Sequence, residues 1–461
     1  MEGKVMRRFT KTLALVLALV MLLTAAGCSA PAAESTTAAI KETTALAQQP
    51  ANGGTGSDQE PVSIRFSWWG GESRHEATKA AVDAFMKEYP WITVECEYGS
   101  FDGGWQDKVA TQLAGGTAPD LLQINWNWLY QYSNDGSKFV DLNDYSDIIS
   151  LGNFPQKDLE AMTVGGKMQG VPISVSSKMF FFNKTSYEKA GLAVPATWDE
   201  LIAAGSVFKE KLGDEYYPMS DGAYARFWMM LLWLQQKYGK PWVENMECQY
   251  TADEVKEGME FINSLEENHV EPTIAQRQAD GVENDLTNPK WMDGRYAGFL
   301  EYESGTENNL NSVNEDQEVV PGEFLTMEGA KPFGFTKVSQ GFAITETSEH
   351  KEEAALLLEF ITSNETGVKA MGTQRGIPCN TKAREYLEAE GMISPVVEQA
   401  ASIVADTCAF SIDPNFENST LYADTGVYIE VFENLSAGGD PAELAQYLID
   451  SVNDVNAANP Y

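Results

Sequence analysis

The spacing of apolar residues alternates between two periods in the first part of the folded chain. Short apolar or alternating runs indicate strands, and apolar residues three or four positions apart indicate amphipathic helices. Five segments follow this pattern in order: strand 64–67, helix 72–89, strand 92–98, helix 105–114 and strand 121–125. Strands that alternate with helices in this way predict a parallel α/β sheet covered by helices.

Helical periods dominate the rest of the chain. The predicted elements are helices over 198–212, 223–238 and 252–268, a helix leading into a strand over 290–299, a strand over 333–344, a helix over 350–362 and a mostly helical region over 398–456. A folded part of about 400 residues is long for a single core. We therefore expect two α/β lobes that the chain crosses more than once.

The first 27 residues predict a secretory signal peptide. Four basic residues precede an unbroken apolar run over 13–23, and small residues then lead to Cys28. The run is too short for a membrane-spanning helix. Small residues before a cysteine resemble a bacterial lipobox, although Ala25 stands where leucine is usual, and this resemblance implies that Cys28 is lipidated. The alternative is an ordinary signal peptide in which Cys28 has no role.

The segment over 28–60 carries Cys28 and then a stretch rich in Ala, Ser, Thr, Gly and Gln that has no aromatic residue. Such a composition cannot bury enough apolar surface to fold, so we expect a flexible tether. No later segment is long and apolar enough to span a membrane. We therefore expect a folded part outside the cytoplasm, attached to the cell membrane by its lipid alone.

Charge and composition exclude several classes of site. The formal net charge of −36 repels nucleic acid and anionic lipid, so neither is expected as a partner. Three isolated histidines argue against a histidine metal site, and no cofactor is expected. Four cysteines besides Cys28 have no metal-binding spacing, and two disulfides or buried thiols both remain open for them: Cys96, Cys248, Cys379 and Cys408.

Aromatic and amide residues gather where the predicted strands end or the chain turns. They are Trp68 and Trp69 with the adjacent Gly70, then Trp105, then Asn125, Trp126 and Asn127. Ligands bind at the carboxyl ends of the strands in an open parallel sheet. Flat aromatic faces suit sugar rings and amides suit their hydroxyl groups, so we predict a sugar-binding cleft. The alternative is that about half of these aromatic residues belong to the core.

Catalytic motifs are absent from the sequence. It contains no GxSxG, HExxH, Walker or GxGxxG pattern. Glu301 and Glu303 are two positions apart, and on a strand both would face one side, as in a carboxylate pair of a surface glycosidase. We favour hydrogen-bond acceptors over this alternative, and we expect the protein not to be an enzyme.

Nine short blocks, in this order, resemble the carbohydrate-binding members of extracellular solute-binding protein family 1, the maltodextrin-binding-like group. They lie at 66–71 (FSWWGG), 84–90, 92–94, 114–120 (AGGTAPD), 170–172, 181–184, 191–201, 341–344 and 354–360. Each block is weak alone, but their order is specific. The resemblance covers nearly the whole chain after the tether.

The resemblance implies a periplasmic-binding-protein type II fold, in which two lobes close about a hinge. Each lobe would be a mixed sheet flanked by helices, with residues 61–172 plus 338–372 in the first lobe and 173–337 plus 373–461 in the second. Such a protein is expected to be a monomer that binds an oligosaccharide and delivers it to the permease subunits of an ABC importer. It would catalyse no reaction.

Within the family, residues 68–75 and 123–128 look most like binding proteins for oligogalacturonides, which are acidic sugars. A uronate needs cations, and four basic residues lie near predicted cleft segments: Arg74, Lys178, Arg226 and Arg375. Each arginine has the alternative of a structural salt bridge. Glu301 completes the predicted ligand-binding set. A surface adhesion scaffold is a third hypothesis, which the lack of internal repeats disfavours.

Overall fold

The computed structural model describes residues 60–461, except 101–103, 282–284 and 424. The predicted signal peptide, the lipidation site Cys28 and the tether up to residue 59 lie outside the described residues. In the described part, no helix combines the length and apolarity needed to cross a membrane. The same residues contain no group of His, Cys, Asp or Glu side chains arranged to hold a metal ion.

The first lobe is built on a six-stranded mixed sheet. Its strands are β13 (Cys408–Ser411), β12 (Gly334–Ile344), β3 (Leu121–Ile124), β1 (Val62–Trp69) and β2 (Ile92–Gly99) in spatial order, with β6 (Val171–Ser176) also paired to β12. Strand β1 is parallel to β2 and β3, as the alternation of strands and helices predicts. Strand β12 is antiparallel to β3 and β6, so a late segment of the chain completes an early sheet.

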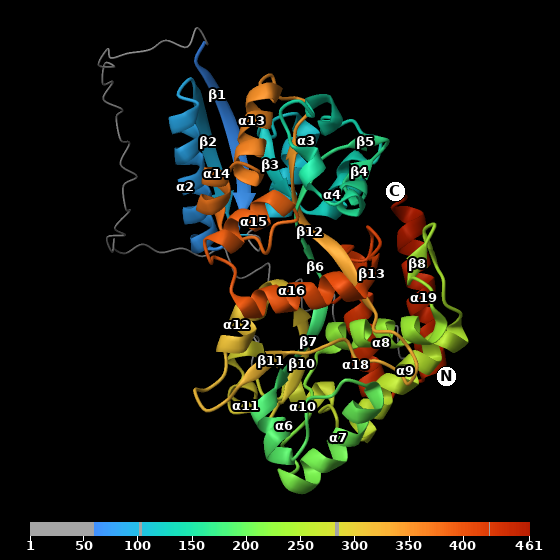
Figure 1. Cartoon of the computed structure of the whole chain (residues 1–461). Coiled ribbons are helices and arrows are strands. Elements are labelled where there is room, and N and C mark those ends of the chain that lie inside the picture. Colours follow the sequence, from blue (N-terminus) through green and yellow to red (C-terminus); the bar gives the residue numbers. More distant parts are fainter. Residues whose placement is uncertain (1–59, 101–103, 282–284, 424) are drawn as a thin grey trace, which may run out of the picture. The chain divides into compact units, whose positions relative to one another are not determined.

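Helices cover this sheet, and several of them come from distant parts of the sequence. They are α2 (Glu72–Glu88), α3 (Trp105–Gly115), α4 (Trp126–Ser133), α5 (Gln156–Ala161), α13 (Lys351–Thr362), α14 (Glu365–Met371) and α15 (Thr381–Ala389). Smaller elements are η3 (Leu142–Tyr145), η4 (Leu151–Asn153), β4 (Thr163–Val164) and β5 (Lys167–Met168). Figure 1 shows α13 and α14, in orange, beside the blue α2, which both of them contact.

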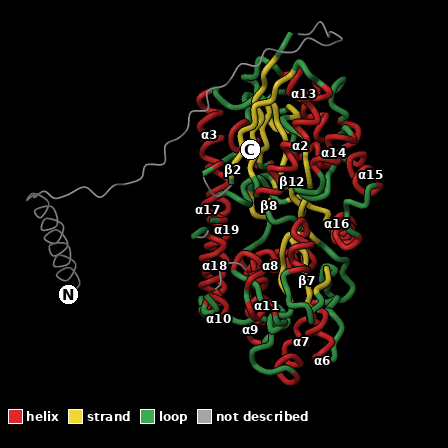
Figure 2. Tube along the Cα trace, turned by 90° about the vertical axis from the view of Figure 1, so that its left-hand side faces the viewer, coloured by secondary structure: helices red, strands yellow, loops and turns green. Residues whose placement is uncertain are grey.

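The second lobe has a smaller sheet in the order β10 (Gly298–Tyr302), β7 (Lys178–Asn183) and β11 (Val319–Pro321). All six residues of β7 are buried, because the strand lies in the middle of the sheet and is covered on both faces. Both pairings are antiparallel, while the isolated bridges Tyr217–Tyr296 and Thr197–Thr326 are parallel. Figure 2 shows the yellow strands of both sheets with red helices around them.

Helices make up most of the second lobe. They are α6 (Lys184–Ala190), α7 (Trp198–Lys211), α8 (Ala223–Tyr238), α9 (Ala252–Glu267), α10 (Ile274–Gln278), α11 (Pro289–Met292), α12 (Thr306–Asn311), α16 (Pro395–Thr407), α17 (Ser419–Tyr422), α18 (Val427–Ser436) and α19 (Pro441–Ala458). Smaller elements are β8 (Val243–Glu244), β9 (Glu247–Cys248), η5 (Asp285–Thr287) and η6 (Glu303–Gly305). The predicted helix-rich middle and C-terminal regions are therefore confirmed.

Capping boxes explain why two of these helices begin where they do. The Thr197 hydroxyl accepts the backbone N–H of Glu200, and the Glu200 carboxylate accepts the N–H of Thr197, at the start of α7. Thr251 and Glu254 make the same reciprocal pair at the start of α9. Each box satisfies backbone donors that a helix start leaves unpaired, so the sequence alone fixes both starts.

The chain passes between the two lobes more than once, and β13, which follows α16, returns it to the first sheet. Ser177 separates β6 of the first sheet from β7 of the second, β12 leads back, and the link between α15 and α16 crosses again. Helix α15 packs on α14, and α16 packs on β11 and α12 of the second lobe. The predicted division of the chain between the two lobes stays a prediction.

Candidate functional site

A cavity of about 540 Å³ lies between the two lobes, and we call it the amide–aromatic cavity. Its first-lobe wall comes from α3, α4 and the end of β3, and Lys337 of β12 also lines it. Its second-lobe wall comes from Tyr302, the segment after β13 and the residues at the end of α19. The lining residues include Gln106, Asn125, Asn127, Tyr130, Tyr302, Asn415, Asn418 and Tyr422. Neutral amides and aromatic rings dominate this wall, which suits a ligand with many hydroxyl groups and apolar ring faces.

Two predicted ligand-binding residues lie in this cavity because β3 ends there. Asn125 is the N-cap of α4, with extended backbone, and makes no capping hydrogen bond with its side chain. Asn127 is buried in the first turn, and its side-chain oxygen has no hydrogen-bond partner within the described part of the protein. A buried amide oxygen without a partner is costly, and a ligand hydroxyl would satisfy it.

The charged residues of the amide–aromatic cavity are already compensated. Lys337 forms an ion pair with Glu417, and the Tyr302 hydroxyl donates to the Glu417 carboxylate at 3.1 Å. The Lys337 ammonium lies 4.9 Å from the centre of the Tyr302 ring, and the Lys178 ammonium lies 4.7 Å from it. These contacts hold Tyr302 in place without leaving a free charge for a ligand.

A second cavity, of about 410 Å³, also has walls from both lobes, and we call it the arginine cavity. Ser73, Arg74, Gln374 and Arg375 line it from the first lobe, Ser339 and Gln340 from β12, and Glu303 and Ser304 from the second lobe. Arg74 and Arg375, two of the predicted ligand-binding residues, are therefore brought together although they lie far apart in the sequence.

Lys178 and Glu301 line a third cavity, of about 660 Å³, in the second lobe. The Lys178 ammonium pairs with the Glu301 carboxylate at 3.0 Å and lies 5.6 Å from the centre of the Tyr224 ring. The two predicted residues thus neutralise each other. Their role as ligand contacts remains a prediction.

The four predicted tryptophans are buried in the protein. Trp68, Trp69, Trp105 and Trp126 are each less than a tenth exposed. The Trp68 indole N–H donates to Nδ1 of His75 at 3.1 Å, and its ring stacks on Tyr98. In this structure these rings contact protein rather than an open cavity, which is the core alternative that the sequence left open.

Gly70 matters for the position of Arg74 rather than for direct contact. A Cβ at Gly70 would overlap the Arg74 side chain, so glycine gives the arginine room to lie against the β1–α2 turn. The Arg74 guanidinium donates to the carbonyl of Gln374 at 3.0 Å and to that of Trp69 at 3.4 Å. Gly70 therefore leaves the space that the Arg74 side chain occupies at the wall of the arginine cavity.

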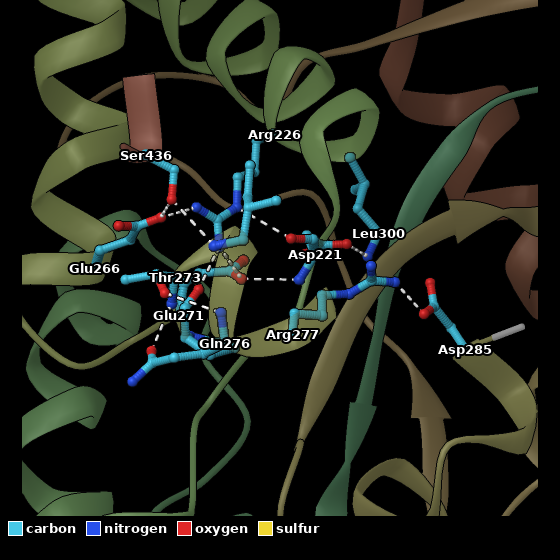
Figure 3. Close-up of polar contacts among 12 residues, drawn as sticks. Asp221, Arg226, Glu266, Glu271, Thr273, Gln276, Arg277, Asp285, Leu300 and Ser436 are labelled. Atoms are coloured by element: carbon cyan, nitrogen blue, oxygen red, sulfur yellow. Dashed lines mark hydrogen bonds and ion pairs between the residues drawn. The ribbon is translucent and has the colours of Figure 1, made fainter. Parts of the chain in front are cut away.

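Arg226 lies apart from all three cavities, in a buried ion cluster on α8 (Figure 3). Its side chain is 1% exposed and forms ion pairs with Glu266 and Glu271. It also donates to the carbonyl oxygens of Asp221 and Pro272. Asp221 and Glu271 lie side by side, and burial raises the pKa of both carboxyls. These contacts indicate a structural role for Arg226.

The four described cysteines are free thiols: Cys96, Cys248, Cys379 and Cys408. Burial raises the pKa of Cys96 to about 11, that of Cys248 and Cys408 to about 12, and that of Cys379 well above the usual range. Thiols with these pKa values stay protonated at neutral pH and are poor nucleophiles. The described residues therefore contain free thiols, of which Cys408 is buried and the other three are partly buried, rather than the disulfides that the spacing also allowed.

Sequence reasoning missed several residues of the two interlobe cavities. Tyr302, Lys337, Glu417 and Tyr422 line the amide–aromatic cavity, and Ser339 lines the arginine cavity. None of them belongs to a motif. The one available signal was the Glu-Tyr-Glu segment at 301–303, in which the tyrosine rather than the carboxylates lines the amide–aromatic cavity.

Comparison with known proteins identifies the family. Residues 71–368 match the profile of the bacterial extracellular solute-binding proteins. A periplasmic solute-binding protein from Pectobacterium atrosepticum is 38% identical, with a TM-score of 0.79, over 86% of this chain and all of that chain. An oligogalacturonide-binding protein from Yersinia enterocolitica, solved with saturated digalacturonic acid, is 32% identical, with a TM-score of 0.77, over 87% of this chain and all of its own.

Curated relatives match over shorter segments. A binding protein of Brucella abortus is 34% identical over 134 residues, which is 29% of this chain and 32% of the relative. The chain thus spans about a third of that relative's length. A de novo designed cysteine esterase also shares the fold, with 31% identity and a TM-score of 0.80 over 87% of this chain and all of that chain. The profile match and the full-length structural likeness show that this chain belongs to the bacterial extracellular solute-binding proteins of the two-lobed type II fold.

Proposed function

We propose that this protein captures an oligosaccharide outside the cytoplasm and delivers it to an ABC importer. The amide–aromatic cavity carries the proposal, because both lobes build it and its wall combines tyrosine rings with neutral amides. Its volume of about 540 Å³ lies within the range of small-ligand sites. The oligogalacturonide bound by the Yersinia relative supports an oligosaccharide ligand, and favours an acidic one.

Membership of this family supports a place outside the cytoplasm. Lipidation of Cys28 would hold the protein at the membrane, and the tether over 28–60 would let the folded part move some distance from that anchor. The protein would then work as a monomer beside its permease.

Ligand binding would close the lobes. A sugar in the amide–aromatic cavity would touch Asn127 on the first lobe and Tyr422 on the second, so it binds the closed arrangement more tightly than the open one. Hinge closure needs only small backbone changes at the crossings between the sheets. The importer would then recognise the surface of the closed binding protein, and that surface would signal that a ligand is bound.

The geometry disfavours the two catalytic alternatives, and we infer that the protein is not an enzyme. Glu301 pairs with Lys178 in the third cavity, whereas Glu303 lines the arginine cavity and accepts hydrogen bonds from Ser176 and Ser177. Two carboxyls in different cavities cannot flank one glycosidic bond. The raised pKa values of the cysteines disfavour the thiolate chemistry of the designed esterase.

A matched pair of tyrosines tests the site. Tyr422 is 43% exposed and lines the amide–aromatic cavity, while Tyr447 on α19 is 42% exposed and lies outside it. The substitution Tyr422→Ala is expected to raise the Kd of an oligosaccharide by about 10-fold, since stacking on an aromatic ring contributes about 1 kcal/mol or more. Tyr447→Ala should leave the Kd unchanged in calorimetric titration. Equal effects of both substitutions, or a ligand recovered in hydrolysed form, would contradict the proposal.

A further inference from the structure

The arginine cavity contains an excess of positive charge that the protein does not neutralise. Of the seven arginines among the described residues, five form ion pairs with carboxylates: Arg65, Arg226, Arg277, Arg295 and Arg384. Arg74 and Arg375 are the two without such a partner in the described part of the chain. Both line the same cavity. In a protein of net charge −36, two neighbouring unpaired arginines need a physical reason.

Arg375 is held by neutral groups alone. Its Nε donates to the side-chain oxygen of Gln123 at 3.2 Å, and the amide of Gln123 in turn donates to Gln340 at 2.8 Å. The guanidinium lies 5.6 Å from the centre of the Phe342 ring. Although Arg375 is only 5% exposed, its Nη2 is buried without a hydrogen-bond partner in the described residues. A fixed, unpartnered donor at a cavity wall is prepared to bind an acceptor.

Arg74 adds a second positive group from α2. It lies in the first turn of this 17-residue helix, and the N-cap Gly71 offers no side chain to the free backbone N–H groups. Both hydrogen bonds that Arg74 makes go to backbone carbonyls. Burial lowers the pKa of Arg74, and burial together with the neighbouring Arg74 charge lowers the pKa of Arg375 well below its ordinary value. An anion between them would relieve this repulsion.

The carboxylates of the cavity do not supply that anion. Glu303 is buried, and its carboxylate accepts the Ser176 hydroxyl at 2.7 Å and the Ser177 backbone N–H at 2.9 Å. Glu307 is exposed on α12, across the cavity from the first lobe. Neither forms an ion pair with Arg74 or Arg375, so the carboxylates that line the cavity leave the two arginines without a counter-charge.

We propose that Arg74 and Arg375 bind a carboxylate of the ligand, which makes the cargo an acidic oligosaccharide containing a uronate ring. The inference rests on the proposed function, because it takes the ligand to be an oligosaccharide bound between the two lobes. Arginine suits this task, since its planar donors match the two oxygens of a carboxylate. Of the four predicted cations, Lys178 and Arg226 are excluded as carboxylate ligands because protein carboxylates already neutralise them.

Two probes that differ in charge and in two small methyl groups test the proposal. Digalacturonic acid and its dimethyl ester share rings, linkage and hydroxyl groups, and only the acid carries carboxylates. Calorimetric titration of the full chain in mild detergent is expected to show at least 100-fold tighter binding of the acid. Raising the salt concentration should weaken binding of the acid and leave binding of the ester unchanged.

Single substitutions assign the effect to the two arginines. Arg74→Gln and Arg375→Gln should each raise the Kd of the acid by about 10- to 100-fold and leave the Kd of the ester unchanged. Arg384→Gln is the control, because Arg384 pairs with Glu388 and Glu398 on the surface. Arg375→Lys, which keeps the charge but loses the planar donors, should fall between the wild type and Arg375→Gln. Should the Arg375 variants melt below the assay temperature, Arg74→Gln carries the test.

The outcomes separate this inference from the proposed function. Equal affinity for the acid and the ester would overturn the inference and leave the oligosaccharide function standing. Equal losses for both probes in Arg74→Gln would also overturn it, because the arginine would then support the fold rather than the carboxylate. Failure of the wild type to bind the acid, the ester or any neutral oligosaccharide would overturn both.

Discussion

Arg226 and Arg375 are both buried arginines, but their surroundings indicate a structural role for Arg226 and a ligand-binding role for Arg375. Arg226, on α8, lies between the carboxylates of Glu266 on α9 and Glu271 just after it (Figure 3). Arg375 meets amides, a methionine sulfur, an aromatic ring and another arginine, and it pairs with no carboxylate of the described residues. Both were predicted as ligand contacts, because sequence position near a strand or helix end cannot show which side-chain partners arrive from elsewhere. Glu266 and Glu271 are 40 or more positions from Arg226.

The substitution Arg226→Met tests the structural role. It leaves Glu266 and Glu271 without their cation, so we expect a loss of about 3–5 kcal/mol in the free energy of unfolding. Denaturant titration measures the loss. The control Arg384→Met removes a surface pair and should cost at most about 1 kcal/mol. Weaker ligand binding by Arg226→Met without any loss of stability would contradict the structural assignment.

Glu303 makes stability depend on pH. Burial raises its pKa from 4.5 to about 7, so the folded state holds this proton more tightly than the unfolded chain does. The stability that this proton contributes is complete below about pH 4.5 and declines as the pH rises to about 7. Glu303→Gln should remove a decline of about 3 kcal/mol between these values.

Unfolding titrations of the wild type and of Glu303→Gln at several pH values check this sign. The control Glu307→Gln changes an exposed carboxylate on the same cavity and should reproduce the wild-type profile. A difference between Glu303→Gln and the wild type that stays constant from pH 4.5 to pH 8 would contradict the prediction.

At the scale of elements, helices were predicted well because their signals are local. The prediction of a helix over 223–238 coincides with α8, and the helix predicted over 198–212 differs from α7 by one residue. Periodicity and capping residues lie within each helix, so distant contacts are not needed. Burial of the tryptophan rings was harder to predict, because the sequence shows that Trp68 lies at the end of a strand but not that Tyr98 and His75 contact its ring.

Gly205 makes the packing of α7 testable. A Cβ at this position would overlap the backbone around Asn268 and His269, just after α9. Alanine normally stabilises a helix interior by about 1 kcal/mol over glycine, but here Gly205→Ala should destabilise by about 1–3 kcal/mol. The melting temperature measures this effect. Ser206→Ala, on the exposed neighbour, should be neutral or slightly stabilising. A rise in melting temperature for Gly205→Ala would contradict the close packing.

At the scale of the whole molecule, two lobes with cavities between them explain the proposed activity. The sequence could predict two α/β lobes, since strand–helix patterns occur at both ends of a long helical region. It could not predict that residues after β3 and residues after β13 would meet in one cavity, because that meeting depends on the chain crossings. Tyr422 illustrates this point, since nothing in its local sequence marks it as a cavity residue.

Closure of the lobes predicts a change in size. A bound oligosaccharide that touches both lobes should reduce the radius of gyration of the full chain in small-angle X-ray scattering. Tyr422→Ala at the same sugar concentration should show less reduction, and Tyr447→Ala should behave like the wild type. Saturation by a sugar with no reduction in radius would contradict closure while leaving binding itself intact.

A thermal-shift screen against uronic and neutral oligosaccharides tests the central claim most directly. A ligand that binds only the folded state adds about 2.7 kcal/mol of stability at 100 times its Kd, so the melting temperature must rise with its concentration. We predict a rise with digalacturonate and a smaller rise or none with maltodextrins and xylo-oligosaccharides. A rise with neutral sugars alone would contradict the carboxylate site, and no rise with any oligosaccharide would contradict the proposed function.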